Sequence, residues 1–208
     1  MTDSCCENRI DVAALRTRER RVLIVVLAIN AATFLMMIFA ATVSGSSSLL
    51  SGALDNLGDA LTYILSLMVV GASGVAKARV ALFKGLLIFV AAIAVAAQIG
   101  WRIANPATPI FEAMGLAALI NLGANGVCLW LLMPYRAGDV NMSSAWECSR
   151  NDVWEGFAVC AAALAVWVVD SGWPDLAIAV GLLALFLRSS VRVIRAALRE
   201  LKMTPTYQ

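Results

Sequence analysis

The sequence predicts an all-α polytopic membrane protein with six transmembrane helices and both termini in the cytoplasm. The 208-residue chain is 61% hydrophobic and only 14% charged, which is more apolar surface than a soluble domain of this size can bury. Its apolar residues gather in runs of roughly 20 residues, the length that crosses a bilayer core. Its basic residues lie almost entirely on one side of a six-helix threading.

Each expected helix is bounded by glycine, proline or polar residues. Gly45 follows the first apolar run, and prolines mark the third, fourth and fifth connections. These helix-breaking residues separate apolar runs that are long enough to span a membrane as helices and contain few charges. The six expected spans are residues 22–43, 49–72, 80–103, 111–134, 143–169 and 174–194.

The distribution of Lys and Arg predicts the orientation. Of the 16 basic residues, only Arg102 falls on the side opposite the termini. Because cytoplasmic loops carry the excess of basic residues, both termini are expected inside. Residues 1–20 are polar and contain acids, so they are interpreted as a cytoplasmic segment rather than a cleavable signal. Residues 21–195 form the expected membrane domain, and residues 196–208 form a short basic cytoplasmic tail.

Two pairs of ligand-type residues lie inside apolar runs. Asp55 and Asp59 fall in the second run, and Cys148 and Asp152 fall in the fifth. The members of each pair are four residues apart, so they share one face of a helix. A carboxylate at the bilayer centre costs about 2.5–3.5 kcal/mol or more, so these acids need a compensating partner. A divalent cation held between the two helices is the simplest such partner.

The two pairs are expected at similar depth. The second helix enters from outside near residue 49, which places Asp59 roughly 15 Å into the bilayer. The fifth helix enters from the cytoplasm near residue 143, which places Asp152 roughly 14 Å deep. If these helices pack side by side, four donors converge on one ion, with Asp55 toward the outside and Cys148 toward the cytoplasm.

The available ligands narrow the choice of metal. The chain has no histidine, and four ligands of mixed oxygen and sulfur suit a tetrahedral ion, with Zn²⁺ leading and Cd²⁺ and Co²⁺ close behind. A thiolate argues against Mg²⁺ and Ca²⁺. Three carboxylates and a thiolate exceed the charge of a divalent ion. Metal binding is therefore expected to expel protons, which is the chemistry of an antiporter.

Three segments carry a resemblance to a known family. They are Gly45-Ser-Ser-Ser-Leu-Leu-Ser-Gly-Ala-Leu-Asp55-Asn-Leu-Gly-Asp59-Ala, Ser144-Ala-Trp-Glu-Cys148-Ser-Arg-Asn-Asp152, and Trp173-Pro-Asp175 with Ile178, Gly181 and Leu182. They resemble the second-, fifth- and sixth-helix motifs of the cation diffusion facilitator family of divalent-metal transporters. The similarity covers roughly residues 20–203. It implies proton-coupled efflux of a divalent metal, usually zinc, by alternating access, with Asp55, Asp59, Cys148 and Asp152 as the transport site.

The chain departs from the family pattern in three ways. Cys148 occupies the fifth-helix position that most often holds histidine, which favours softer ions such as Cd²⁺. The cytoplasmic C-terminal domain that usually binds metal and holds the family's dimer is not recognised after the sixth helix. The link at residues 71–84 lacks the His and Asp that bind an accessory ion in some members.

Other polar residues have a functional interpretation and a plainer one. Asparagines within the spans either line the ion path or form interhelical hydrogen bonds. Acidic residues flanking the fifth-helix pair attract cations or relay protons, or are solvated helix-end residues. Two N-terminal thiols either capture a soft metal or have no such role. The asparagines are Asn30, Asn121 and Asn125, the acidic residues are Glu147 and Glu155, and the N-terminal thiols are those of Cys5 and Cys6.

The sequence therefore predicts a secondary transporter that exchanges cytoplasmic Zn²⁺, or alternatively Cd²⁺ or Co²⁺, for protons. No nucleotide loop or nucleophile–base set indicates an enzyme, no resident cofactor is expected, and nothing indicates nucleic-acid binding. Two alternatives stay open, a metal sensor or assembly subunit that does not transport and a proton or sodium pathway. The bilayer of a bacterial inner membrane is the expected location, and a homodimer, if one forms, would pair through the transmembrane helices.

Overall fold

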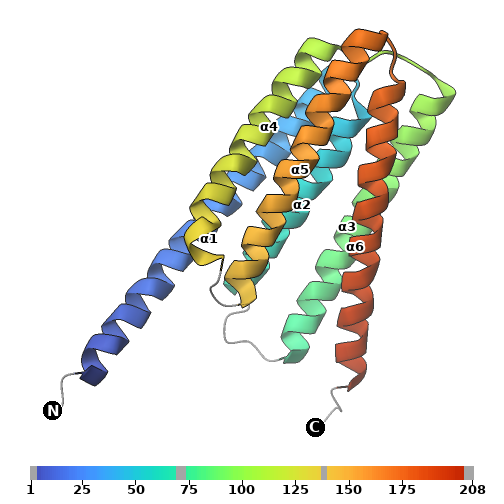
Figure 1. The fold of residues 1–208 in the computed structure, drawn as a ribbon. Helices are drawn as coiled ribbons and strands as arrows, with labels where there is room; N and C mark the ends of the chain where they lie inside the picture. The colour runs from blue at the N-terminus through green and yellow to red at the C-terminus, as the bar shows by residue number, and fades with distance from the viewer. Residues whose placement is uncertain (1–3, 69–73, 137–139, 204–208) are drawn as a thin grey trace.

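The structure is a computed structural model that describes residues 4–68, 74–136 and 140–203. These residues form a bundle of long helices without any strand, which confirms the predicted all-α class (Figure 1). Helix bounds agree with the sequence prediction to within a few residues at most connections. The first helix begins earlier and the last ends later, because residues that favour helices continue beyond the apolar runs. The helices are α1 (Ser4–Ser44), α2 (Ser47–Met68), α3 (Gly74–Ala104), α4 (Phe111–Leu132), α5 (Val140–Val169) and α6 (Trp173–Met203), with a short 3-10 turn η1 (Met133–Tyr135) after α4.

Four helical stretches within the described residues are long and apolar enough to cross a membrane. They are Arg18–Ser44, Gly85–Ala104, Phe111–Tyr135 and Ala145–Val169. Each has at least the 20 or so residues that a bilayer core requires. The chain is therefore an integral membrane protein.

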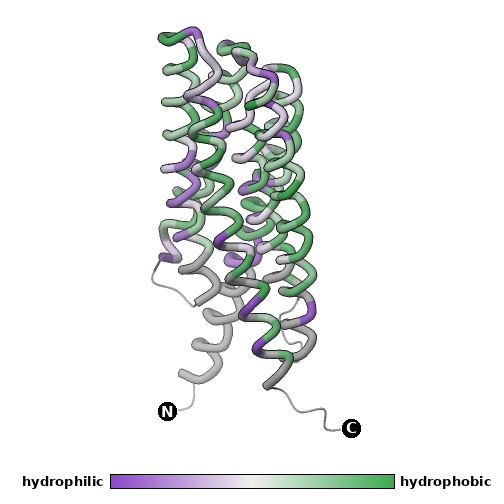
Figure 2. The backbone as a smooth tube through the Cα atoms, turned by 90° about the vertical axis from the view of Figure 1, so that its right-hand side faces the viewer, coloured by the Kyte–Doolittle hydropathy of each residue, from purple (hydrophilic) through white to green (hydrophobic). Residues whose placement is uncertain are grey.

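The bundle has an apolar exterior and several polar residues inside. Large apolar side chains project outward, among them Phe39, which is 71% exposed, and Phe83, which is 69% exposed. Asn125 and Asp152 are by contrast 2% and 4% exposed. Hydrophobic residues predominate along the helices in Figure 2, with hydrophilic positions scattered among them. This distribution suits a lipid environment, in which polar groups within the spans face the bundle interior.

The helices divide into a group of four and a pair. Helices α1, α2, α4 and α5 share two buried apolar clusters, one containing Met37 and Val166 and the other containing Val26 and Tyr63. Helices α3 and α6 pack along each other and join α2 through a third cluster around Leu54 (Figure 1). Within the pair, Ser190 Oγ donates to the carbonyl oxygen of Gly85 at 2.9 Å. Glycine at that position lets the two helices approach closely.

A tight turn joins α1 to α2 at the end of the bundle that also carries the α3–α4 and α5–α6 connections. We call this end the turn end, and the opposite end, where α1 starts and α6 finishes, the terminus end. Gly45 ends α1 with a left-handed φ of 71°, and its N–H donates to Ala41 at 2.9 Å. Ser46 then caps α2, because its Oγ accepts the N–H of Leu49 at 3.1 Å.

Replacing Gly45 with alanine is expected to lower the free energy of unfolding by about 1–2 kcal/mol, the cost of a side chain in left-handed backbone. The added Cβ would also overlap the Arg102 side chain, which donates to the Gly45 carbonyl oxygen. Gly100→Ala is the matched control, because Gly100 lies in α3 with no atom near its missing Cβ. Unfolding in mixed micelles measures both variants, and equal stability of the two would contradict the turn's requirement for glycine.

Candidate metal site

Three carboxylates from two helices meet inside the four-helix group. Asp55 and Asp59 lie two and three turns into α2, and Asp152 lies in the first half of α5. One oxygen from each carboxylate falls within 4.8 Å of the others. Asp59 and Asp152 are 8% and 4% exposed, whereas Asp55 is half-buried. The predicted packing of the second helix against the fifth, with their acids facing each other, is therefore present in the fold.

The carboxylates lie between the two apolar clusters of the four-helix group. On α2, Ala53 belongs to the first cluster and Tyr63 to the second, and Asp55 and Asp59 fall between them. On α5 the order is reversed, because Ala145 belongs to the second cluster and Val159 to the first. Antiparallel packing thus places the acids of both helices in one polar layer with apolar side chains above and below it.

The site has the charge and the open acceptors that a cation requires. Three ionised carboxylates at this separation repel one another unless a cation or protons intervene. One buried oxygen of α5, Asp152 Oδ2, has no hydrogen-bond partner among the described residues. A buried acceptor without a partner loses its hydration without compensation. A divalent cation between the three carboxylates would satisfy Asp152 and balance most of the charge.

Tyr63 supports the site from α2 and was not recognised from the sequence. Its hydroxyl donates to Asp59 Oδ2 at 3.2 Å, and its side chain is 1% exposed. The available signal was the spacing, because Tyr63 follows Asp59 by four residues and so lies on the same helix face. The bond restricts the orientation of the Asp59 carboxylate.

Replacing Tyr63 with phenylalanine is expected to weaken zinc binding by about tenfold, the lower end of the range for groups that orient metal ligands. The ring still fills its place in the apolar cluster, so the fold should be retained. Zinc titration calorimetry on the purified protein measures the effect, and Tyr135→Phe, at a half-buried tyrosine near the end of α4, is the control. A dissociation constant equal to that of the unmodified protein would show that the bond does not orient Asp59.

Cys148 lies beside the three carboxylates but is not one of the group that converges within 4.8 Å. It precedes Asp152 by one turn of α5 and is half-buried. Its charge would act on both Asp152 and Tyr63. Its role as a fourth ligand is therefore still a prediction. No disulfide joins Cys128, Cys148 or Cys160, the cysteines whose side chains the structure describes.

The predicted asparagines are buried within α1 and α4. Asn121 accepts a hydrogen bond from Asn56 Nδ2 at 2.8 Å, and Asn30 Nδ2 lies 3.9 Å from Cys128 Sγ. Amide oxygens of Asn30, Asn56 and Asn125 have no partner within the described part of the chain. The hydrogen bond from Asn56 on α2 to Asn121 on α4 supports an interhelical role for Asn121. A role of the asparagines in the ion path is still a prediction. The sequence does not single out Asn56, because it directly follows Asp55 in the acidic motif.

The remaining predicted residues lie at the edge of the site or outside the described side chains. Glu155 is half-buried and within electrostatic range of Asp55 and Asp59. Glu147 is exposed near the start of α5. Cys5 and Cys6 fall in the first turns of α1, and their side chains lie outside the part that the structure describes.

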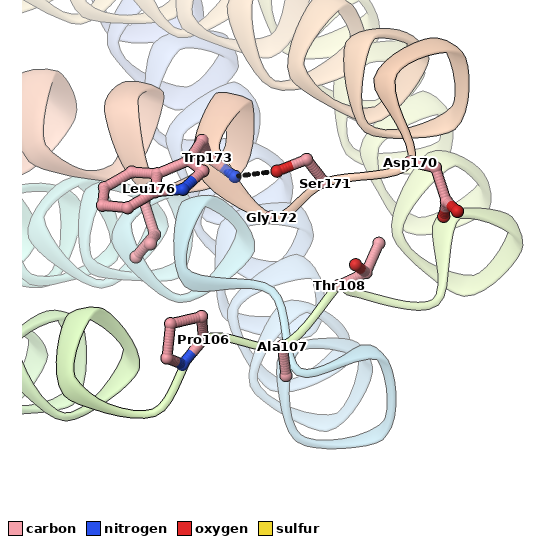
Figure 3. A pocket seen from close by; sticks show the side chains of 8 residues that line it. All are labelled: Pro106, Ala107, Thr108, Asp170, Ser171, Gly172, Trp173 and Leu176. Carbon is pink, nitrogen blue, oxygen red and sulfur yellow. Dashed lines mark hydrogen bonds between the residues drawn. The ribbon is translucent and has the colours of Figure 1, made fainter.

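A separate pocket of about 140 Å³ opens at the turn end. It lies between the α3–α4 connection and the α5–α6 turn, and Figure 3 shows Asp170, Thr108 and Trp173 among the residues around it. Asp170 is exposed. None of the three clustered carboxylates lines this pocket, so it is not the metal site.

Comparison with known proteins identifies the family. The model of the cation efflux transmembrane domain matches residues 23–202, which includes every described helix bearing the carboxylates and asparagines. Comparison with curated proteins gives no match. Acids brought together between α2 and α5 inside an apolar bundle agree with the transport of a metal cation, and the match spans nearly the whole chain. The chain therefore belongs to the cation efflux family, also called the cation diffusion facilitators, whose members are transporters.

Proposed function

We propose that this cation efflux protein exports Zn²⁺ from the cytoplasm in exchange for protons, with Cd²⁺ and Co²⁺ as alternative substrates. The observation that carries the proposal is the convergence of Asp55, Asp59 and Asp152 within 4.8 Å inside the bundle. Three oxygen ligands leave a fourth position open for Cys148 or water, and four-coordination by mixed ligands suits Zn²⁺.

The coupling to protons follows from competition at the same oxygens. A carboxylate binds a metal ion only when it is deprotonated, so metal entry releases protons and protonation releases the metal. Because the site lies in a buried layer, leaving all three acids charged without a counter-ion would be costly. The transporter therefore alternates between a metal-loaded and a protonated form, and alternating access exposes each form to one side of the membrane in turn.

The proposed orientation places six spans across the membrane with both termini in the cytoplasm. The start of α1 and the end of α6 lie at the same end of the bundle (Figure 1). The basic residues lie in the half of the bundle nearer this terminus end, except Arg188 at the middle of α6 and Arg102 near the turn end, as the positive-inside rule favours. The turn end then faces outside. We further propose a bacterial inner membrane as the location and pairing through transmembrane helices for any homodimer.

Flux across reconstituted vesicles tests the proposal directly. Vesicles that enclose a zinc-sensitive dye and a pH-sensitive dye should report zinc movement in one direction and proton movement in the other when either gradient is imposed. Zinc binding without flux would favour a sensor or assembly subunit. Proton or sodium movement that is independent of zinc would favour a simple ion pathway, and either result would overturn metal–proton exchange.

A further inference from the structure

Asp175, at the start of α6, makes a dense set of contacts with the start of α2. Its Oδ1 accepts the Ser46 hydroxyl at 2.6 Å and the Ser48 N–H at 3.0 Å, and its Oδ2 accepts the Ser47 N–H at 2.7 Å. The side chain is only 1% exposed. All of these bonds join the start of α6 to the start of α2 at the turn end.

These contacts attach α2 firmly to α6 because they satisfy N–H groups at the start of α2 that otherwise have no partner. The first N–H groups of a helix have no partner within the helix, and the helix dipole favours negative charge at this end. A carboxylate from α6 supplies both the acceptors and the charge. Hydrogen bonds to charged groups are stronger than those between neutral groups, so the attachment resists small displacements of α2.

Two neighbouring contacts hold the same part of α2 and its preceding turn. Ser51 Oγ, one turn into α2, donates to the Ala179 carbonyl oxygen of α6 at 3.2 Å. Arg102, at the end of α3, donates to the carbonyl oxygen of Gly45. Helix α6 thus holds the start of α2, and α3 holds the turn that precedes it. Asp55 and Asp59 follow on the same rigid helix, so their height is set from this end.

We propose that Asp175 is a positioning residue for the metal site: by anchoring the start of α2 to α6, it holds Asp55 and Asp59 at the height where they face Asp152. Asp175 does not touch the three carboxylates, and it acts through the axial position of α2. The proposal rests on the proposed function for its metal, and it adds a residue from a third helix to the determinants of zinc affinity.

Asp175→Asn tests the anchor by two measurements. Asparagine keeps the shape but replaces one acceptor oxygen by an NH₂ group, which cannot accept from the α2 amides. The amides of Ser47 and Ser48 should then exchange hydrogen faster, a readout that needs no metal. The zinc dissociation constant should rise by about tenfold, as for groups that orient metal ligands, in protein that still elutes as a folded monodisperse species.

Matched variants separate positioning from charge and from folding. Asp170→Asn removes the same charge from the exposed α5–α6 turn nearby, and asparagine tolerates the positive φ of 48° found there; it should change neither measurement. Ser46→Ala removes one of the three bonds to Asp175 together with the cap on the Leu49 N–H, and it leaves the two bonds from the Ser47 and Ser48 amides in place. It should shift both measurements in the same direction by less, which keeps the test valid if Asp175→Asn does not fold.

The outcomes distinguish the two proposals. Unchanged zinc affinity in folded Asp175→Asn, or an equal loss of affinity in Asp170→Asn, would overturn the positioning role. Unchanged amide exchange would overturn the anchor itself. Absence of zinc binding by the unmodified protein would overturn the proposed function, while amide exchange would still decide whether Asp175 anchors α2.

Discussion

Replacing Asp152 with asparagine is expected to abolish metal–proton exchange. The substitution keeps the side chain's shape but removes the negative charge from the α5 side of the site. Loss of one metal bond worth about 2.8 kcal/mol already weakens zinc binding by about 100-fold. The amide that replaces the carboxylate also cannot take up a proton when the metal leaves, so it cannot couple metal release to proton binding. Zinc titration and vesicle flux on the same preparation measure the two effects.

The fold should survive this change, because asparagine relieves repulsion among the three clustered acids rather than creating a cavity. Size-exclusion chromatography and thermal unfolding check this point. Asp59→Asn should behave in the same way from the α2 side, whereas Asp170→Asn, an exposed carboxylate outside the site, should retain full exchange. Undiminished exchange in Asp152→Asn and Asp59→Asn would exclude the three-carboxylate site.

Replacing Cys148 with serine is expected to change which metal binds best. A thiolate is a soft ligand that prefers Cd²⁺, whereas a hydroxyl is a weak and harder one. If the thiol completes the coordination of the ion, cadmium affinity should fall by about tenfold, equal to about 1.4 kcal/mol, and zinc affinity should fall less. Competition between cadmium and zinc, measured by titration of one metal in the presence of the other, gives the ratio directly.

Cys148→His is the complementary variant and should retain zinc transport while lowering the preference for cadmium. Cys160→Ser is the matched control, because Cys160 lies on the same helix but packs against the apolar cluster that contains Val159 and Val166. A cadmium-to-zinc ratio that stays constant in both Cys148 variants would show that the thiol is not a ligand.

Much of the architecture was predictable because long apolar runs indicate helices that lie in lipid. The expected spans match α4 and α5 to within three residues, and the match to the cation efflux domain confirms the family suggested by the two ligand motifs. The convergence of Asp55, Asp59 and Asp152 was also expected, since antiparallel helices of known direction place these acids at one depth. The six-span count and the orientation of the termini are still predictions.

The supporting residues were less predictable because their roles depend on contacts between distant segments. Tyr63 looks like a core aromatic residue until its hydroxyl is seen beside Asp59. Asn56 contacts Asn121, 65 residues away, and no local pattern specifies that pairing. Asp175 resembles an ordinary first-turn acid of its own helix, yet its bonds go to the start of α2.

By itself, the sequence determined that this protein is a helical membrane protein and which acids must find a partner, because hydropathy and the cost of burying charge act on each segment locally. Only the tertiary structure decided that three carboxylates form the close group while Cys148 stays beside it. It also decided that α2 is anchored by α6. The physical reason is that helix packing sets rotation and axial height, and these depend on side chains of several helices at once.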